Sequence, residues 1–241
     1  MNRGQRTPRV LGAAVLLVFV ASLLSEQLLE YSVGSGSISE MLVNISGNVQ
    51  LMQISNLVAL VNSLGIVALG VLFYFFLSEH NKVLALIALG CYLAEAVTLA
   101  MSKIGSYGLI TVSQEFLLAG SPRVSYFKTF RNFLYNSFVQ QGYNMHMLFF
   151  CVGGIIWYFL LFHLRKVPPV LSIWGLAGIF LLTIPVVCSL LDLDPLFVMV
   201  LGLPYAPFEF VLGIWLIVKG FNSPPIAPHL TEIDGEITGT S

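Results

Sequence analysis

Long apolar stretches separated by short polar segments form the main pattern of this chain. Several stretches contain no Lys, Arg, Asp or Glu: Val10 to Ser25, Met41 to Ser78, Asn132 to Leu164 and Val167 to Leu191. Two further stretches contain a single acid, which is Glu95 between Val83 and Ser102 and Glu209 between Pro195 and Val218. A helix needs about 20 predominantly apolar residues to cross a bilayer. The pattern predicts an all-α, polytopic transmembrane bundle with six spans, at about residues 10–30, 54–77, 83–104, 143–163, 170–191 and 196–219.

The segments outside these spans predict a single membrane domain at residues 10–222. Residues 1–9 contain three arginines and are expected to form a basic cytoplasmic N-terminus. The run Val10 to Leu24 resembles a secretory signal peptide, but no A-x-A-like cleavage site follows it and further spans do, so we expect an uncleaved first helix. Residues 223–241 are rich in proline, acids and small residues, which predicts a disordered cytoplasmic tail.

The distribution of basic residues predicts the orientation of the bundle. If the six spans cross the membrane in alternating directions, one group of basic residues lies on the same side as both termini. This group contains Arg3, Arg6, Arg9, Lys82, Arg165, Lys166 and Lys219. The smaller group falls on the other side, within one connection: Lys103, Arg123, Lys128 and Arg131. Cytoplasmic loops of membrane proteins carry an excess of Lys and Arg. We therefore expect both termini in the cytoplasm and the protein in the inner, or plasma, membrane.

The longest connection between predicted spans runs from Gly105 to Gln141. Structureless loops of such length are uncommon. Apolar residues repeat in it at helical spacing: Phe127, Phe130, Phe133 or Leu134, and Phe138. The segment could form an interfacial amphipathic helix or the early turns of a long fourth helix. The pattern does not choose between these two alternatives.

Two ionisable residues fall near the middle of predicted spans. Glu95 lies in the third span and Glu209 in the sixth, where Pro204 and Pro207 also interrupt the apolar run. An ionised carboxylate in hydrocarbon is costly unless it is paired, hydrated or protonated. Discontinuous helices are typical of intramembrane binding sites. Glu95 and Glu209 are therefore the leading candidates for binding a ligand or a proton.

Further polar residues lie at compatible depths in other spans. At a rise of about 1.5 Å per residue, Glu26, Asn62 and His146 fall in the outer halves of the first, second and fourth helices. Their gathering predicts a polar pocket that opens toward the outer face. The structural alternative is that these residues are interhelical hydrogen-bonding partners, which contribute about 0.6–2 kcal/mol each. For Glu26, at the end of its helix, the structural role is the favoured interpretation.

Composition excludes several classes of function. Apolar residues make up 57% of the chain and charged residues 10%, against roughly 25% charged in soluble domains. The net charge of −1 gives no field that would attract nucleic acid. Cys91, Cys151 and Cys188 have no disulfide or zinc spacing. The chain also lacks the G-x-S-x-G, H-E-x-x-H and G-x-x-x-x-G-K motifs, so no cofactor or metal is predicted.

The resulting hypothesis is a non-enzymatic membrane protein with the lipid bilayer as its environment. Its pocket is expected to bind a small solute, a lipid headgroup or a proton, and the protein could be a transporter. A first alternative is an intramembrane enzyme that uses His146 with Glu95 or Glu209. A second is a structural or sensory subunit in which the acids only specify packing. The oligomeric state is left open by the sequence.

Four short motifs resemble a known bacterial family. They are Ser25-Glu26 at the end of the first helix, Ala94-Glu95-Ala96 in the third, Val167-Pro168-Pro169 before the fifth, and Glu209 followed by Trp215 to Asn222. With these motifs, the region from about Thr7 to Asn222 resembles domain-of-unknown-function family 4386. The resemblance implies a six-helix integral membrane protein. It implies no activity.

Overall fold

The computed structural model describes residues 3–79, 81–120, 125–193 and 199–222. The described chain is helical, without strands. Its elements are α1 (Arg3–Val33), α2 (Ile38–Gly47), α3 (Val49–Leu77), α4 (Lys82–Leu118), α5 (Ser125–Phe133), the π-helix η1 (Leu134–Gln140), α6 (Gln141–His163), α7 (Pro169–Leu190), the 3-10 helix η2 (Met199–Gly202) and α8 (Tyr205–Val218). The predicted tail at residues 223–241, Arg123 and the start of the sixth span lie outside the described residues.

Six helical segments of the described chain are long and apolar enough to cross a membrane. They cover residues 8–33, 49–77, 82–118, 126–163, 169–190 and 200–218. Large apolar side chains such as Leu64, Phe75 and Val170 point outward, which suits a lipid-facing surface. The prediction of an all-α polytopic bundle with six spans is therefore confirmed.

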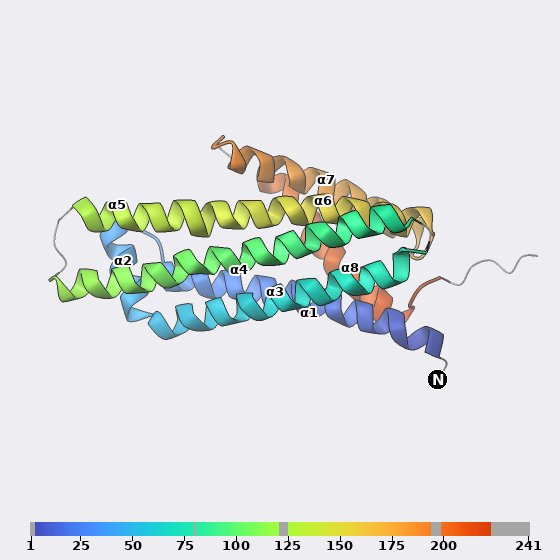
Figure 1. Ribbon diagram of the computed structural model, residues 1–241, viewed down its shortest axis with the longest axis horizontal. Coiled ribbons are helices and arrows are strands. Elements are labelled where there is room, and N and C mark those ends of the chain that lie inside the picture. The colour runs from blue at the N-terminus through green and yellow to red at the C-terminus, as the bar shows by residue number, and fades with distance from the viewer. Residues whose placement is uncertain (1–2, 80, 121–124, 194–198, 223–241) are drawn as a thin grey trace, which may run out of the picture.

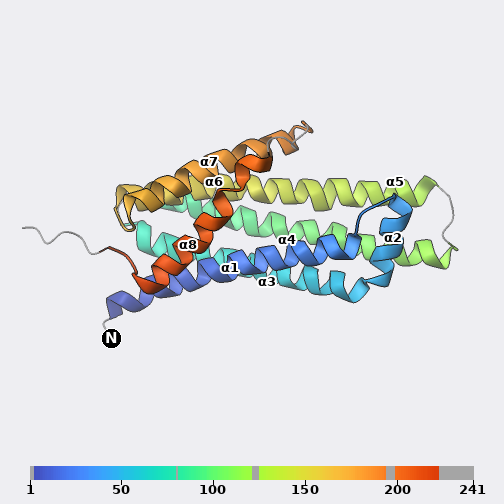
Figure 2. The same ribbon diagram turned by 180° about the vertical axis from the view of Figure 1, so that it is seen from behind.

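The long helices pack side by side (Figure 1). α1 contacts α3 and α8, α4 contacts α3 and α6, and α7 packs on α6 (Figure 2). We call the end where α1 begins and α8 finishes the terminal end, and the opposite end, with α2 and α5, the hairpin end. α2 begins at this hairpin end with a capping box, in which Ser37 and Glu40 each satisfy the other's backbone N–H.

The third and fourth spans are longer than the predicted ranges 83–104 and 143–163. α4 continues to Leu118, and α5, η1 and α6 follow one another without a break from Ser125 to His163. The open choice for the amphipathic segment is thereby resolved in favour of the early turns of a long fourth helix. Phe127 is buried, with its ring centroid 5.5 Å from that of Phe116 on α4, so the segment packs on protein.

The sixth span is interrupted. Proline lacks a backbone N–H and fits an α-helix best in its first turn, and α8 accordingly begins at Tyr205, two residues before Pro207. The preceding residues form η2 instead. Trp174 of α7 donates its indole N–H to the Pro204 carbonyl oxygen at 3.0 Å, which fixes the position of the break.

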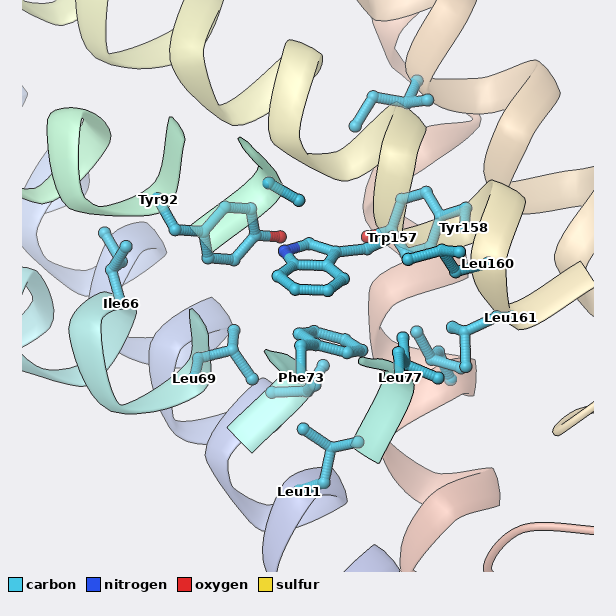
Figure 3. Close-up of a cluster of buried hydrophobic side chains, with 14 of the residues drawn as sticks. Leu11, Ile66, Leu69, Phe73, Leu77, Tyr92, Trp157, Tyr158, Leu160 and Leu161 are labelled. Carbon is cyan, nitrogen blue, oxygen red and sulfur yellow. The ribbon is translucent and has the colours of Figure 1, made fainter. Parts of the chain in front are cut away.

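Two apolar clusters divide the interior. The cluster toward the terminal end is built around Trp157, whose ring stacks on Phe73 at 5.3 Å and meets Tyr92 edge-on at 6.1 Å (Figure 3). The cluster toward the hairpin end joins α2 to the far parts of α4 and η1 and includes Leu42 and Leu109. Most buried polar side chains lie between these clusters or in the hairpin-end half, with Ser172 as an exception.

Candidate functional site

A cavity of about 210 Å³ lies inside the bundle, where α1, α3, α4, α6 and α8 meet. Four of the five candidate residues line it: Asn62 of α3, Glu95 of α4, His146 of α6 and Glu209 of α8. They come from distant parts of the sequence, and the antiparallel packing brings them to one level of the bundle. We call this cavity the polar pocket.

Glu95 is the more enclosed of the two pocket carboxylates, since its residue is 2% exposed. His146 Nδ1 lies 3.4 Å from the Glu95 backbone oxygen and 3.9 Å from Glu95 Oε1. A carbonyl oxygen can only accept, so this contact requires the imidazole hydrogen on Nδ1. In the neutral ring, Nε2 then remains an acceptor. His146 therefore bonds to the Glu95 backbone and lies beside Oε1, while Glu95 Oε2 is left without a partner among the described residues.

Glu209 ends a short chain of hydrogen bonds. Tyr205 Oη donates to Glu209 Oε1 at 3.0 Å, one helical turn away on α8. The Tyr158 hydroxyl of α6 also bonds to the Tyr205 hydroxyl. Because Tyr205 has a single hydroxyl hydrogen and gives it to Glu209, Tyr158 must be the donor in the second bond. The order Tyr158 to Tyr205 to Glu209 joins α6 to α8 beneath the pocket.

Two buried acceptor atoms at the pocket lack a hydrogen-bond partner within the described chain. They are Glu95 Oε2 and Asn62 Oδ1, and Asn62 is 1% exposed. An unpaired buried acceptor costs about 1–3 kcal/mol. A hydrogen-bond donor entering the pocket would remove that cost, so the arrangement is suited to binding a donor-bearing molecule.

Aromatic and aliphatic side chains complete the pocket wall. Phe19, Tyr143 and Phe150 line it, and the Phe150 ring meets Tyr205 edge-on at 5.4 Å. Ile66 lines the pocket and also belongs to the terminal-end cluster, so the part of that cluster around Trp157, here called the Trp157 layer, adjoins the pocket. The pocket thus combines two carboxylates with a largely apolar wall.

Glu26 is the one candidate that does not line the polar pocket. It lines a second cavity of about 650 Å³ nearer the hairpin end, together with Glu30 and Asn144. Its Oε1 lies 3.9 Å from Nζ of Lys103, a lysine that is 3% exposed. This contact with Lys103 fits the structural role that we expect for Glu26. Tyr143 lines both cavities and so stands between them.

Three residues at or near the site were not predicted from the sequence: Tyr143, Tyr205 and Lys103. Tyr205 precedes Glu209 by four residues and Tyr143 precedes His146 by three, spacings that place side chains on one helix face. Those spacings could have identified both tyrosines. Lys103 gave no such signal, because its partner Glu26 comes from another helix.

Comparison with known proteins identifies the family of this chain. No curated protein and no solved structure matches it. The sequence pattern of the family described as Domain of unknown function (DUF4386) matches residues 10–220. The match extends from the first half of α1 to the end of α8 and includes every residue of the polar pocket named above. The chain therefore belongs to the family described as Domain of unknown function, DUF4386.

Proposed function

We propose that this protein is a multi-pass protein of a bacterial inner membrane that binds a small solute in the polar pocket. Glu95, Glu209, His146 and Asn62 are assigned as the binding residues. Both termini are placed in the cytoplasm on the distribution of Lys and Arg. The hairpin end then faces outward, and the Trp157 layer lies between the pocket and the cytoplasm.

The observation that carries this proposal is the pair of unpartnered acceptors on two different helices at one cavity. Elsewhere in the bundle polar groups pair directly, as where the Ser106 hydroxyl donates to Asn56 Oδ1 at 2.7 Å. Other buried polar atoms without a partner among the described residues, such as Asn56 Nδ2, belong to residues that do not line the polar pocket. Glu95 Oε2 and Asn62 Oδ1 make no such bond within the described chain. A solute that donates hydrogen bonds to both is the simplest source of compensation.

The proposal predicts ligand-dependent stabilisation of the purified full-length protein. In detergent, the melting temperature is measured against a panel of small amines, alcohols, amino acids and carboxylic acids. At least one solute should raise it, because a ligand that binds only the folded state stabilises that state. Glu95→Gln should abolish the shift. Native mass spectrometry of the same preparation shows whether a phospholipid occupies the pocket instead.

Glu115→Gln is the matched control, since Glu115 is an exposed carboxylate on the same helix. It should keep the shift of the natural protein. If no solute in the panel raises the melting temperature and no lipid is retained, the binding function is wrong. Glu95 and Asn62 would then be packing residues only.

A further inference from the structure

The charges around the polar pocket are unbalanced. Glu95 and Glu209 both line it, whereas its described lining contains no Lys or Arg. Lys103 is buried on the same helix as Glu95, but its ammonium group faces Glu26, which lines the other cavity. No fixed cation of the described chain therefore neutralises the two pocket carboxylates by lining the same cavity.

The hydrogen-bonding groups are unbalanced in the same direction. The pocket offers Glu95 Oε2 and Asn62 Oδ1 as buried acceptors without donors. The Tyr205 hydroxyl is committed to Glu209, and the Tyr143 hydroxyl, a further donor group that lines the pocket, bonds to neither acceptor. A ligand that fits must supply several donors and a positive charge. A primary ammonium group does both, since it carries three N–H donors and no acceptor.

The apolar side chains of the pocket wall indicate the chemistry of the uncharged part of the ligand, which we call its body. The rings of Phe19, Tyr143 and Phe150 line the cavity, together with aliphatic Val18 and Leu182. Aromatic faces attract cations within about 6 Å of their centroids, and apolar walls favour an apolar ligand body. The cavity has a volume of about 210 Å³. The ligand must therefore be small.

We propose that the polar pocket binds a small organic ammonium ion with a short apolar or aromatic body. The ammonium group lies between Glu95, Asn62 and Glu209, and the body lies against Phe19 and Phe150. A carboxylate at the same place would face two acids and is disfavoured. This inference rests on the proposed solute-binding function and specifies the chemical class of the solute.

The test compares three molecules of nearly equal shape and different charge: benzylammonium, benzyl alcohol and benzoate. Binding to the purified full-length protein is measured by calorimetry and by melting temperature at constant ionic strength. Benzylammonium should bind, and benzyl alcohol and benzoate should bind at least tenfold more weakly. A charged hydrogen bond contributes about 1.5–3 kcal/mol, so Glu95→Gln and Glu209→Gln should each weaken benzylammonium binding roughly ten- to a hundredfold.

A thiol-protection measurement locates the binding. Ser22 lines the polar pocket and Ser35 lines the second cavity. Ser22→Cys and Ser35→Cys are made in a background where Cys91, Cys151 and Cys188 are replaced by alanine. Benzylammonium should slow the reaction of the cysteine at position 22 with a soluble thiol reagent by about tenfold, the factor expected at a tenfold excess over the dissociation constant. The cysteine at position 35 should react at an unchanged rate.

The possible failures are distinguishable. Equal protection of position 22 by benzyl alcohol or benzoate overturns the ammonium class and leaves solute binding intact. An equal effect of sodium chloride at the same concentration overturns the organic class in favour of an inorganic cation. If none of the probes protects position 22 and the wider solute panel also gives no thermal shift, both proposals fail together. The protection measurement still decides the question if a glutamine variant does not fold.

Discussion

Tyr205 couples Glu209 to α6 through hydrogen bonds. Its hydroxyl donates to Glu209 and accepts from Tyr158, so it serves two partners at once. Tyr158 lies at the end of this series of hydrogen bonds, and its hydroxyl bonds to one partner. The two tyrosines are both buried, which makes their hydroxyl groups comparable in desolvation.

Removing these hydroxyl groups should therefore have unequal effects. Tyr205→Phe leaves Glu209 Oε1 without its donor and the Tyr158 hydroxyl without its acceptor, and should lower the free energy of unfolding by about 2–4 kcal/mol. Tyr158→Phe removes a donor from an oxygen that keeps its own bond, and should cost about 1 kcal/mol. Unfolding in mixed micelles measures both. Equal effects would contradict the assigned order of the chain.

Single residues also show what the sequence could reveal about the site. Glu95 and Glu209 were predicted because a carboxylate within an apolar run is costly and therefore conspicuous. Asn62 and His146 followed from their depth. Lys103 was assigned to a loop, because a lysine normally ends an apolar stretch. Its burial depends on Glu26 of a different helix, and no spacing within one helix reports such a partner.

Among the helical elements, α4 and η1 make an unusually close contact. A Cβ atom at Gly105 would collide with the Phe138 side chain and approach the Leu134 carbonyl oxygen at 3.0 Å. Glycine at this position lets the π-helical turn lie directly on α4. Gly90, on the same helix, faces open space.

Gly105→Ala should consequently push η1 away from α4 and destabilise the protein by about 1–3 kcal/mol, the range found for overpacked contacts. Gly90→Ala is the matched control. It should stabilise the protein by about 0.5–1 kcal/mol, because alanine favours a helix over glycine where space permits. Melting temperatures of both variants provide the measurement, and a neutral Gly105→Ala would contradict the close contact.

The observed lengths of the helices show the limit of predicting helix ends from the positions of charged residues. The third span was predicted to end at residue 104, next to Lys103, yet α4 continues to Leu118. The fourth span was predicted to begin at residue 143, with Arg131 in the preceding connection, yet that arginine lies within the long fourth helix, where it is buried and stacks on Tyr135 at 4.3 Å. Both cations are accommodated by neighbouring side chains. Apolar runs locate the helices, whereas tertiary partners determine where they end.

For the whole molecule, the most important expectation is the orientation of the bundle in the membrane, because it determines which side the polar pocket faces. With both termini in the cytoplasm, the hairpin end lies outside, and the polar pocket is expected to open toward that side. A cysteine replacing Ser35, at the hairpin end, should react with a membrane-impermeant thiol reagent in intact bacterial cells. A cysteine replacing Glu79, in the turn between α3 and α4, should react only after the cells are permeabilised. The reverse pattern would show that the pocket faces the cytoplasm.

The helix α4 is longer than a bilayer requires, so the two ends of the molecule differ in structure. α4 has 37 residues and is about 55 Å long at 1.5 Å per residue, whereas the hydrocarbon layer is about 30 Å thick. At the hairpin end, α2, α5 and the last turns of α4 share one apolar cluster, and we call this part of the molecule the hairpin cap. A nanobody raised against this cap would bind helices that pack on the hairpin-end cluster, away from the residues that line the polar pocket. The chain has a mass of 26.4 kDa, and the nanobody would add mass and an asymmetric feature by which single particles can be aligned in electron cryomicroscopy. The polar pocket would remain accessible to a ligand.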